Sequence, residues 1–226
     1  MRERATTLAV ILALMLGVAA CSGGREANVV NQYFTALRAN DTNTLTSFAS
    51  VQFDQKVDDY KIVAVGPETK TPATLPELVQ KQKDLEAELA KNTRDARAWG
   101  NDLAIYPKLD QVRSIRQKDG KVPASLQPIA EKWDAYQGED RRLKKAVSDA
   151  KTAVEKEKRN VALSIGQAED IETLTGEVVS KDVELNLTIG GQVKPYVMTL
   201  HKYELTGGTG PRMVSRWVVQ SLVPKG

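Results

Sequence analysis

The spacing of apolar residues changes twice along the chain and predicts three regions of different structure. In the first region, apolar side chains recur at helical spacing between residues 27 and 39. The stripe on this helix consists of Val29, Val30, Tyr33, Phe34 and Leu37. Asp41 is placed to cap a second short helix that carries Leu45 and Phe48, and residues 59–65 follow as a strand. The opening therefore predicts a helix–helix–strand unit.

The middle of the chain predicts two long helices. Residues 75–117 are rich in Lys, Glu, Gln and Ala, with apolar residues near a 3-4 spacing and a break or kink at Pro107. The apolar positions of this segment are Leu78, Leu85, Leu89, Ala96, Trp99, Leu103 and Tyr106. After a turn at 118–121, residues 123–168 show a heptad pattern with two polar interruptions. This heptad seam consists of Ile129, Trp133, Tyr136, Asp140, Leu143, Val147, Ala150, Val154, Glu157 and Val161. We expect an antiparallel helical hairpin, coiled-coil-like, with arms of about 45 residues and about 65 Å.

The last third of the chain alternates as β-strands do. Apolar residues at every second position of 183–189 predict a half-buried strand, and Gly190-Gly191 predicts a hairpin turn. Residues 193–205 form the expected return strand, and 213–223 close the sheet. A further strand is expected near 172–180, so this region predicts a meander of three or four antiparallel strands. The fold class is therefore α+β.

The first twenty residues read as an export signal. Arg2 and Arg4 precede an apolar run of about a dozen residues, which is too short to span a bilayer comfortably. The ending Val18-Ala19-Ala20-Cys21 resembles the bacterial lipobox, although that pattern prefers Leu where this chain has Val18. The resemblance implies a thioether-linked diacylglycerol on Cys21, cleavage before it, and membrane attachment through two or three acyl chains.

An ordinary secretory signal followed by a free cysteine is the alternative. Cys21 is the only cysteine, so no intramolecular disulfide is available to this chain. Residues 21–26 read as the lipidated N-terminus and a short tether, since Ser22-Gly23-Gly24 is flexible. We expect a location in the cell envelope. In a diderm host, Ser22 would fit sorting to the outer membrane, facing the periplasm, and otherwise the anchor would lie in the cell membrane.

The two ends of the chain resemble one known family. The segment from Val29 to Asp41, with its Tyr33-Phe34 pair, looks like the first helix of nuclear transport factor two-like proteins. Residues 59–65 would then be the first strand of that cone-shaped fold, and Trp217-Val218-Val219 its last. The resemblance implies a small cone-like domain formed by 27–72 and 169–226 and interrupted by the helical hairpin at 73–168. An unrelated α+β domain with a coiled-coil arm is the alternative.

Candidate chemistry is sparse. Enzymes of the cone fold use an Asp–His pair, but the single histidine, His201, lies on a strand, and nothing in the spacing selects Asp58 or Asp59 as its partner. No cysteine pair, second histidine or calcium-loop spacing suggests a metal. The glycine-rich stretches join strands, so they do not indicate phosphate loops. We therefore expect no enzyme activity and no cofactor.

Composition and charge favour a soluble, non-nucleic-acid-binding protein. Charged residues make up 27% of the chain and hydrophobic ones 41%, and the formal net charge is only +3. Trp99, Trp133 and Tyr136 either pack between the helical arms or cap an exposed patch used by a partner. The basic stretch 141–145 reads as a solvated face, with contact to anionic lipid or cell-wall polymer as the alternative.

Three functional hypotheses follow from these observations. The first is a non-enzymatic binding or adaptor module that contacts a protein partner, or a second copy of itself, through the hairpin. The second is a small-ligand or enzymatic pocket in the cone around His201. The third is a structural spacer in the envelope, which would tolerate changes of arm length that preserve the seam.

Overall fold

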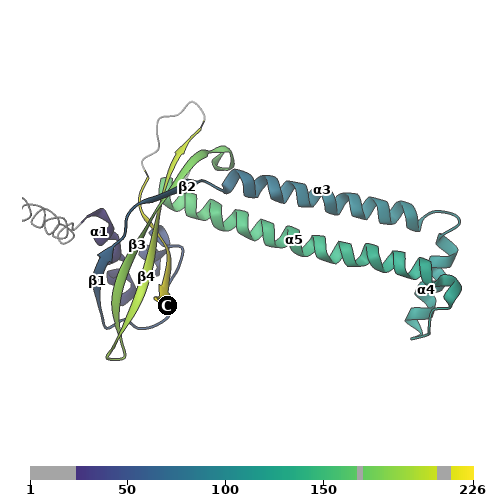
Figure 1. The fold of residues 1–226 in the computed structure, drawn as a ribbon, viewed down its shortest axis with the longest axis horizontal. Helices are drawn as coiled ribbons and strands as arrows, with labels where there is room; N and C mark the ends of the chain where they lie inside the picture. The colour runs from purple at the N-terminus through teal and green to yellow at the C-terminus, as the bar shows by residue number, and fades with distance from the viewer. Residues whose placement is uncertain (1–23, 167–169, 208–214) are drawn as a thin grey trace, which may run out of the picture. The chain divides into compact units, whose positions relative to one another are not determined.

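The computed structural model describes residues 24–166, 170–207 and 215–226 and divides them into two compact units (Figure 1). The first unit comprises the described residues up to Thr71 together with 178–203 and 215–226. The second comprises the described residues of 72–177 and 204–214. The elements in chain order are α1 (Arg25–Arg38), α2 (Thr42–Phe48), β1 (Asp59–Val65), β2 (Thr69–Pro72), α3 (Leu75–Gly100), α4 (Tyr106–Gln117), the 3-10 turn η1 (Ala124–Leu126), α5 (Gln127–Ile165), the 3-10 turn η2 (Ile171–Thr173), β3 (Thr175–Ile189), β4 (Gln192–Thr206) and β5 (Val218–Pro224). The fold is α+β with a five-stranded antiparallel sheet.

The two short helices of the first unit form where the sequence predicts them. The apolar stripe of α1 is buried, with Val30, Tyr33 and Phe34 at 0% exposure. The backbone amide of Thr44 donates to the Asp41 carboxylate at 3.0 Å, so Asp41 caps α2 as expected. Both helices thus present an apolar face to the sheet strands that follow.

The sheet has the strand order β1-β3-β4-β5, and β2 pairs with β3. β1 occupies the predicted residues and runs antiparallel to β3, with Tyr60 opposite Leu187. The β3–β4 turn is made by Gly190 and Gly191, whose φ angles of 58° and 75° favour glycine. The strand expected near 172–180 forms from Thr175 onwards, but it is continuous with the strand expected at 183–189, so the two are one strand, β3. The short, fully exposed β2 was not predicted.

The last predicted strand is shorter than expected. β5 begins at Val218, and residues 213 and 214 of the expected strand lie outside the described residues. A bulge between Thr199 and Leu200 shifts its register with β4.

The core of the first unit is continuous. Phe34 and Tyr60 stack with ring centroids 4.4 Å apart, and Leu185, Leu187 and Met198 are at most 1% exposed. These side chains join α1 and α2 to the inner faces of β1, β3 and β4. These apolar side chains therefore form one continuous cluster in the described part of the unit.

In the second unit, α3 and α5 lie side by side and run in opposite directions (Figure 1). Trp99, near the end of α3, has its ring centroid 5.7 Å from that of Tyr136, near the start of α5. Every position of the heptad seam predicted on α5 is buried or half-buried. On α3 only Leu75 and Gly100 are fully buried, because each of two paired helices covers only one side of the other.

The first long helix ends earlier than expected, at Gly100. The Asp102 carboxylate accepts from the Ala104 amide at 2.7 Å and turns the chain, and Pro107 then stands in the first turn of α4. Leu103 and Tyr106 were expected on the apolar stripe, but Leu103 is 93% exposed in this turn and Tyr106 is 54% exposed at the start of α4.

Helix α4 packs against α5. Leu109 and Val112 are at most 1% exposed, and Leu109 also contacts Gly100. The guanidinium of Arg116 makes two hydrogen bonds to the Asp134 carboxylate, at 2.6 and 2.7 Å. These contacts hold α4 beside the meeting point of α3 and α5.

Candidate functional site

Cys21, the predicted lipid-attachment residue, lies outside the described residues. Helix α1 begins four positions after it, at Arg25. No helix in the described part of the chain is long and apolar enough to cross a membrane.

Asp58 and Asp59, the carboxylates considered as partners of His201, contact other residues. His201 is half-buried on β4, with its ring centroid 6.4 Å from that of Tyr203. Asp58 accepts from the Gly191 amide at 3.4 Å, and Asp59 pairs with Arg38 at 3.3 Å. The structure therefore does not assemble an acid–base pair from these residues. Over the described residues, no three His, Cys, Asp or Glu side chains converge as they would around a metal ion.

Three of the four basic residues in the stretch 141–145 of α5 pair with nearby carboxylates. Arg142 pairs with Glu139 at 2.6 Å, Lys144 with Asp140 at 2.8 Å, and Lys145 with Asp149 at 2.7 Å. All are within one helical turn, as expected for a solvated helix face.

A hollow of about 350 Å³ lies in the second unit between α3, α4 and α5. We call it the distal hollow. Its surface is mixed: Trp133, Tyr136 and Tyr106 are aromatic, and Asn92 is among the amides. The Asn92 side chain donates to the Tyr136 carbonyl at 3.3 Å and so ties α3 to α5 beside the hollow.

Aromatic residues at the distal hollow and beside it play two roles. Trp99 packs against Tyr136 between α3 and α5, and the Lys132 ammonium lies 5.3 Å from the Trp99 ring centroid. Trp133 lines the hollow, as Tyr136 does, and the Arg113 guanidinium carbon lies 4.6 Å from the Trp133 ring centroid. The first pair fits the packing interpretation, while Trp133 fits the exposed-patch interpretation.

The distal hollow carries more positive than negative charge. Its charged lining residues are Arg97, Arg113, Lys144 and Asp140, and Lys144 is paired with Asp140. Neither Arg97 nor Arg113 makes an ion pair with a described residue. Two guanidinium groups beside an aromatic wall suit a carboxylate or another anion.

Sequence reasoning missed Arg97 and Arg113. On one continuous helix these residues, 16 positions apart, would be separated by about 24 Å. They line the same hollow because the chain turns at Asp102 and α4 packs back on α5. The only available signal was Pro107, which marked the break without giving its direction.

Comparisons with known proteins provide no relative. No family model matches the chain, and neither the curated proteins nor the solved structures contain a match.

Proposed function

We propose that this protein is a lipoprotein of the cell envelope, anchored through acyl chains on Cys21, that acts as a non-enzymatic adaptor. In this proposal α3 and α5 form a helical hairpin whose distal hollow binds a protein partner. The partner segment would be acidic, with at least one apolar side chain.

One observation carries the adaptor proposal. Arg97 and Arg113 line the distal hollow, and neither pairs with a carboxylate of the described residues. Leu103 is exposed in the adjoining turn, and Tyr106 is exposed at the start of α4. Exposed large apolar residues beside aromatic and Arg side chains are the composition of binding hot spots. An acidic segment would complete the ion pairs that the chain itself leaves open.

The arrangement of the first unit supports a cone-like domain of the nuclear transport factor two-like kind. Two helices precede β1, the remaining long strands come from the other end of the chain, and Trp217, immediately before β5, is buried in the core. We propose that residues 73–168 interrupt this domain as an insertion.

In this proposal the continuous apolar core of the first unit supports a binding role rather than a catalytic pocket. Its side chains join α1 and α2 to the sheet, where an enzyme of the cone fold would keep space open for substrate. The dependence of function on arm length distinguishes the spacer hypothesis from the adaptor proposal. A spacer would still function after removal of one heptad from each of α3 and α5, whereas an adaptor with a single docking surface would not.

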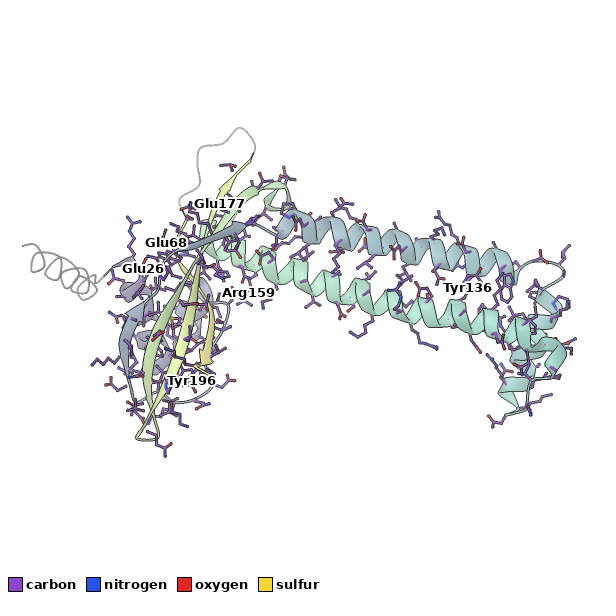
Figure 2. All side chains as sticks on the ribbon, in the orientation of Figure 1. Glu26, Glu68, Tyr136, Arg159, Glu177 and Tyr196 are labelled. Atoms are coloured by element: carbon purple, nitrogen blue, oxygen red, sulfur yellow. The ribbon has the colours of Figure 1, made fainter. Side chains whose placement is uncertain are left out.

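Capture from envelope extracts tests the adaptor role. Purified wild-type protein, Arg113→Gln and Leu103→Ser are compared as baits. Arg159→Gln is the control for charge, since Arg159 is exposed elsewhere on α5 (Figure 2), and Val193→Ser is the control for an exposed apolar residue. We expect one partner to be retained by wild type and both controls, and its recovery to fall at least tenfold with either hollow variant, since hot-spot residues are worth more than about 1.4 kcal/mol. Equal recovery from all five baits contradicts the proposal.

Replacement of the thiol tests the anchor. With Cys21→Ser in the native host, the acyl chains have no attachment point, so the protein should lose membrane association and accumulate unprocessed. Membrane fractionation and the mass of the N-terminal peptide report both effects. A variant that stays membrane-bound and is cut at the same bond contradicts anchoring.

A further inference from the structure

A second hollow, of about 300 Å³, lies in the first unit among α1, the end of α2, β4 and residues 215–217. Arg25, Val29 and Gln32 line it from one face of α1, because positions i, i+4 and i+7 share a helix face. Val29 and Phe48 give it apolar surface, and Trp217, which is 6% exposed, closes one side. We call it the Trp217 hollow.

The charge around the Trp217 hollow is positive. Its charged lining residues are Arg25, Lys202 and Arg216, and none of the described residues that line it is a carboxylate. The Lys202 ammonium lies 5.2 Å from the Trp217 ring centroid. The Arg216 guanidinium donates to the Ser47 carbonyl at 2.7 Å, which holds it beside the end of α2.

Two carboxylates near the hollow share a cation that does not line it. Glu26 lies 2.7 Å and Glu68 3.3 Å from the Lys181 ammonium, which is itself 5.7 Å from the Trp217 ring centroid. Lys202 also acts electrostatically on Glu26, and the described cations at this place, Arg25, Lys181, Lys202 and Arg216, outnumber the two carboxylates. An anion is the complementary ligand.

The position of the hollow along the chain indicates where that anion comes from. Arg25 follows Cys21 by four residues, and a fully extended chain of that length spans at most about 14 Å. If Cys21 carries acyl chains in a bilayer, Arg25 and the α1 edge of the hollow stay beside the headgroups. Attraction between the cations and anionic headgroups acts over about 8–10 Å at physiological salt, so it operates in this layer.

We propose that the Trp217 hollow binds the phosphate of an anionic phospholipid headgroup, with Arg25 and Lys202 as its contacts. Guanidinium and ammonium groups are the phosphate donors that proteins use, and the Val29–Phe48 surface suits the adjoining glycerol carbons. Binding at this hollow, together with the acyl chains, would fix which face of the first unit meets the membrane. The inference rests on the anchoring at Cys21 that is part of the proposed function.

Vesicle sedimentation tests the headgroup site without the acyl chains. The processed chain, residues 21–226 with Cys21→Ser, is mixed at low salt with vesicles of phosphatidylglycerol or of phosphatidylcholine. Arg25→Gln with Lys202→Gln is compared with Lys56→Gln with Lys194→Gln, two exposed lysines of the same unit that do not line the hollow. Far-UV circular dichroism verifies that each variant is folded.

We expect the chain to bind phosphatidylglycerol at least tenfold more strongly than phosphatidylcholine. Each cation at an anionic surface contributes about fivefold, so the hollow variant should lose about 25-fold, while the control pair loses no more than about twofold. Equal binding to both lipids, or equal losses in the two variants, overturns the proposal. If inorganic phosphate at constant ionic strength displaces the protein from phosphatidylglycerol vesicles, the proposal is also overturned, because the hollow would then be a site for free phosphate.

The two proposals fail separately. The mass of the N-terminal peptide from the native host reports acylation of Cys21 and does not depend on the hollow. The vesicle assay uses a chain that cannot be acylated, so its result does not depend on the anchor.

Discussion

The Lys181 ammonium lies 2.7 Å from the Glu26 carboxylate and joins β3 to the first turn of α1 across 155 positions of sequence. Both side chains are less than one-fifth exposed. Burial raises the pKa of Glu26, but the hydrogen bond and charge of Lys181, a backbone hydrogen bond and the charge of Lys202 together lower it by more, and the net pKa lies below its ordinary value. The same contact raises the pKa of Lys181.

Glu26→Gln should lower the free energy of unfolding at neutral pH by about 1.5 kcal/mol, the contribution of a hydrogen bond to a charged group. A carboxyl whose pKa is depressed by folding stabilises the protein above its unfolded pKa, and this stability is lost as pH falls through the folded pKa. The wild type should therefore lose more stability than Glu26→Gln below about pH 4.5, the ordinary value for Glu. Urea unfolding at several pH values measures this difference. Glu131→Gln, at an exposed position of α5, is the control, and equal acid slopes in all three proteins contradict the prediction.

Tyr33 should make the first unit sensitive to alkali. Burial raises the pKa of the Tyr33 hydroxyl to about 12, and the hydroxyl donates to the Val51 carbonyl at 3.2 Å. Because its folded pKa lies above the unfolded value of 10.0, its contribution is complete below pH 10 and is lost as pH rises towards 12. The two-unit difference corresponds to about 3 kcal/mol.

Tyr33→Phe should cost about 1 kcal/mol at pH 8, from the lost hydrogen bond, and should then unfold with a weaker pH dependence above pH 10. Tyr106→Phe, at a 54% exposed position, should keep the wild-type dependence. Denaturant unfolding followed between pH 8 and pH 12 compares the three proteins. If the free energies of unfolding of wild type and Tyr33→Phe fall in parallel above pH 10, folding does not raise the pKa of Tyr33 and the prediction is wrong.

Leu109 should hold α4 in place. It is 1% exposed and contacts Gly100, so Leu109→Ala leaves a cavity where α4 packs back. Buried Leu→Ala changes cost about 2–5 kcal/mol, which is enough to release a 12-residue helix locally. Amide hydrogen exchange should become at least tenfold faster across 106–117 while the middle of α5 keeps its protection. Ser114→Ala, exposed on the same helix, is the control.

The same substitution links the fold of α4 to the distal hollow. Arg113 reaches the Trp133 ring only because α4 lies on α5, so Leu109→Ala should also weaken partner capture. Partner binding that survives release of α4 would place the binding surface elsewhere on the chain.

The elements that were predictable from sequence are those that local pattern decides. Asp41 caps α2 and the stripe of α1 is buried because caps and helical periodicity act within a few residues. Gly190 and Gly191 turn the chain between β3 and β4 for the same reason, since a two-residue turn requires positive φ.

The features that were missed depend on contacts distant in sequence. Nothing near Leu103 indicates that it will be 93% exposed, because it continues the apolar spacing of α3. The fold-back is favoured by the burial of Leu109 and Val112 and by the Arg116–Asp134 pair, which are contacts with other parts of the chain. The same fold-back creates the distal hollow, so Arg97 and Arg113 could not be identified as neighbours. The Trp217 hollow collects residues from α1, α2, β4 and 215–217, which no single segment reveals.

Two glycines offer a test in which the same substitution should have opposite effects. Gly176 has a φ of 148°, and a Cβ there would overlap the Glu204 carbonyl oxygen and lie 3.0 Å from the Leu205 Cα. Neither is a flexible side chain, so the two backbones would have to separate, and Gly176→Ala should destabilise the protein by about 3 kcal/mol.

Gly138 lies inside α5 with no atom within 4 Å of the added Cβ, so Gly138→Ala should stabilise the helix by about 1 kcal/mol. Thermal unfolding followed by far-UV circular dichroism should show the Gly176 variant melting below wild type and the Gly138 variant above it. If Gly176→Ala melts with the wild type, β3 and β4 do not approach as closely at Glu204 as the structure describes. If Gly138→Ala is destabilised instead, its side of α5 is covered by a second copy or a partner, because only an added contact could oppose the gain in helix propensity.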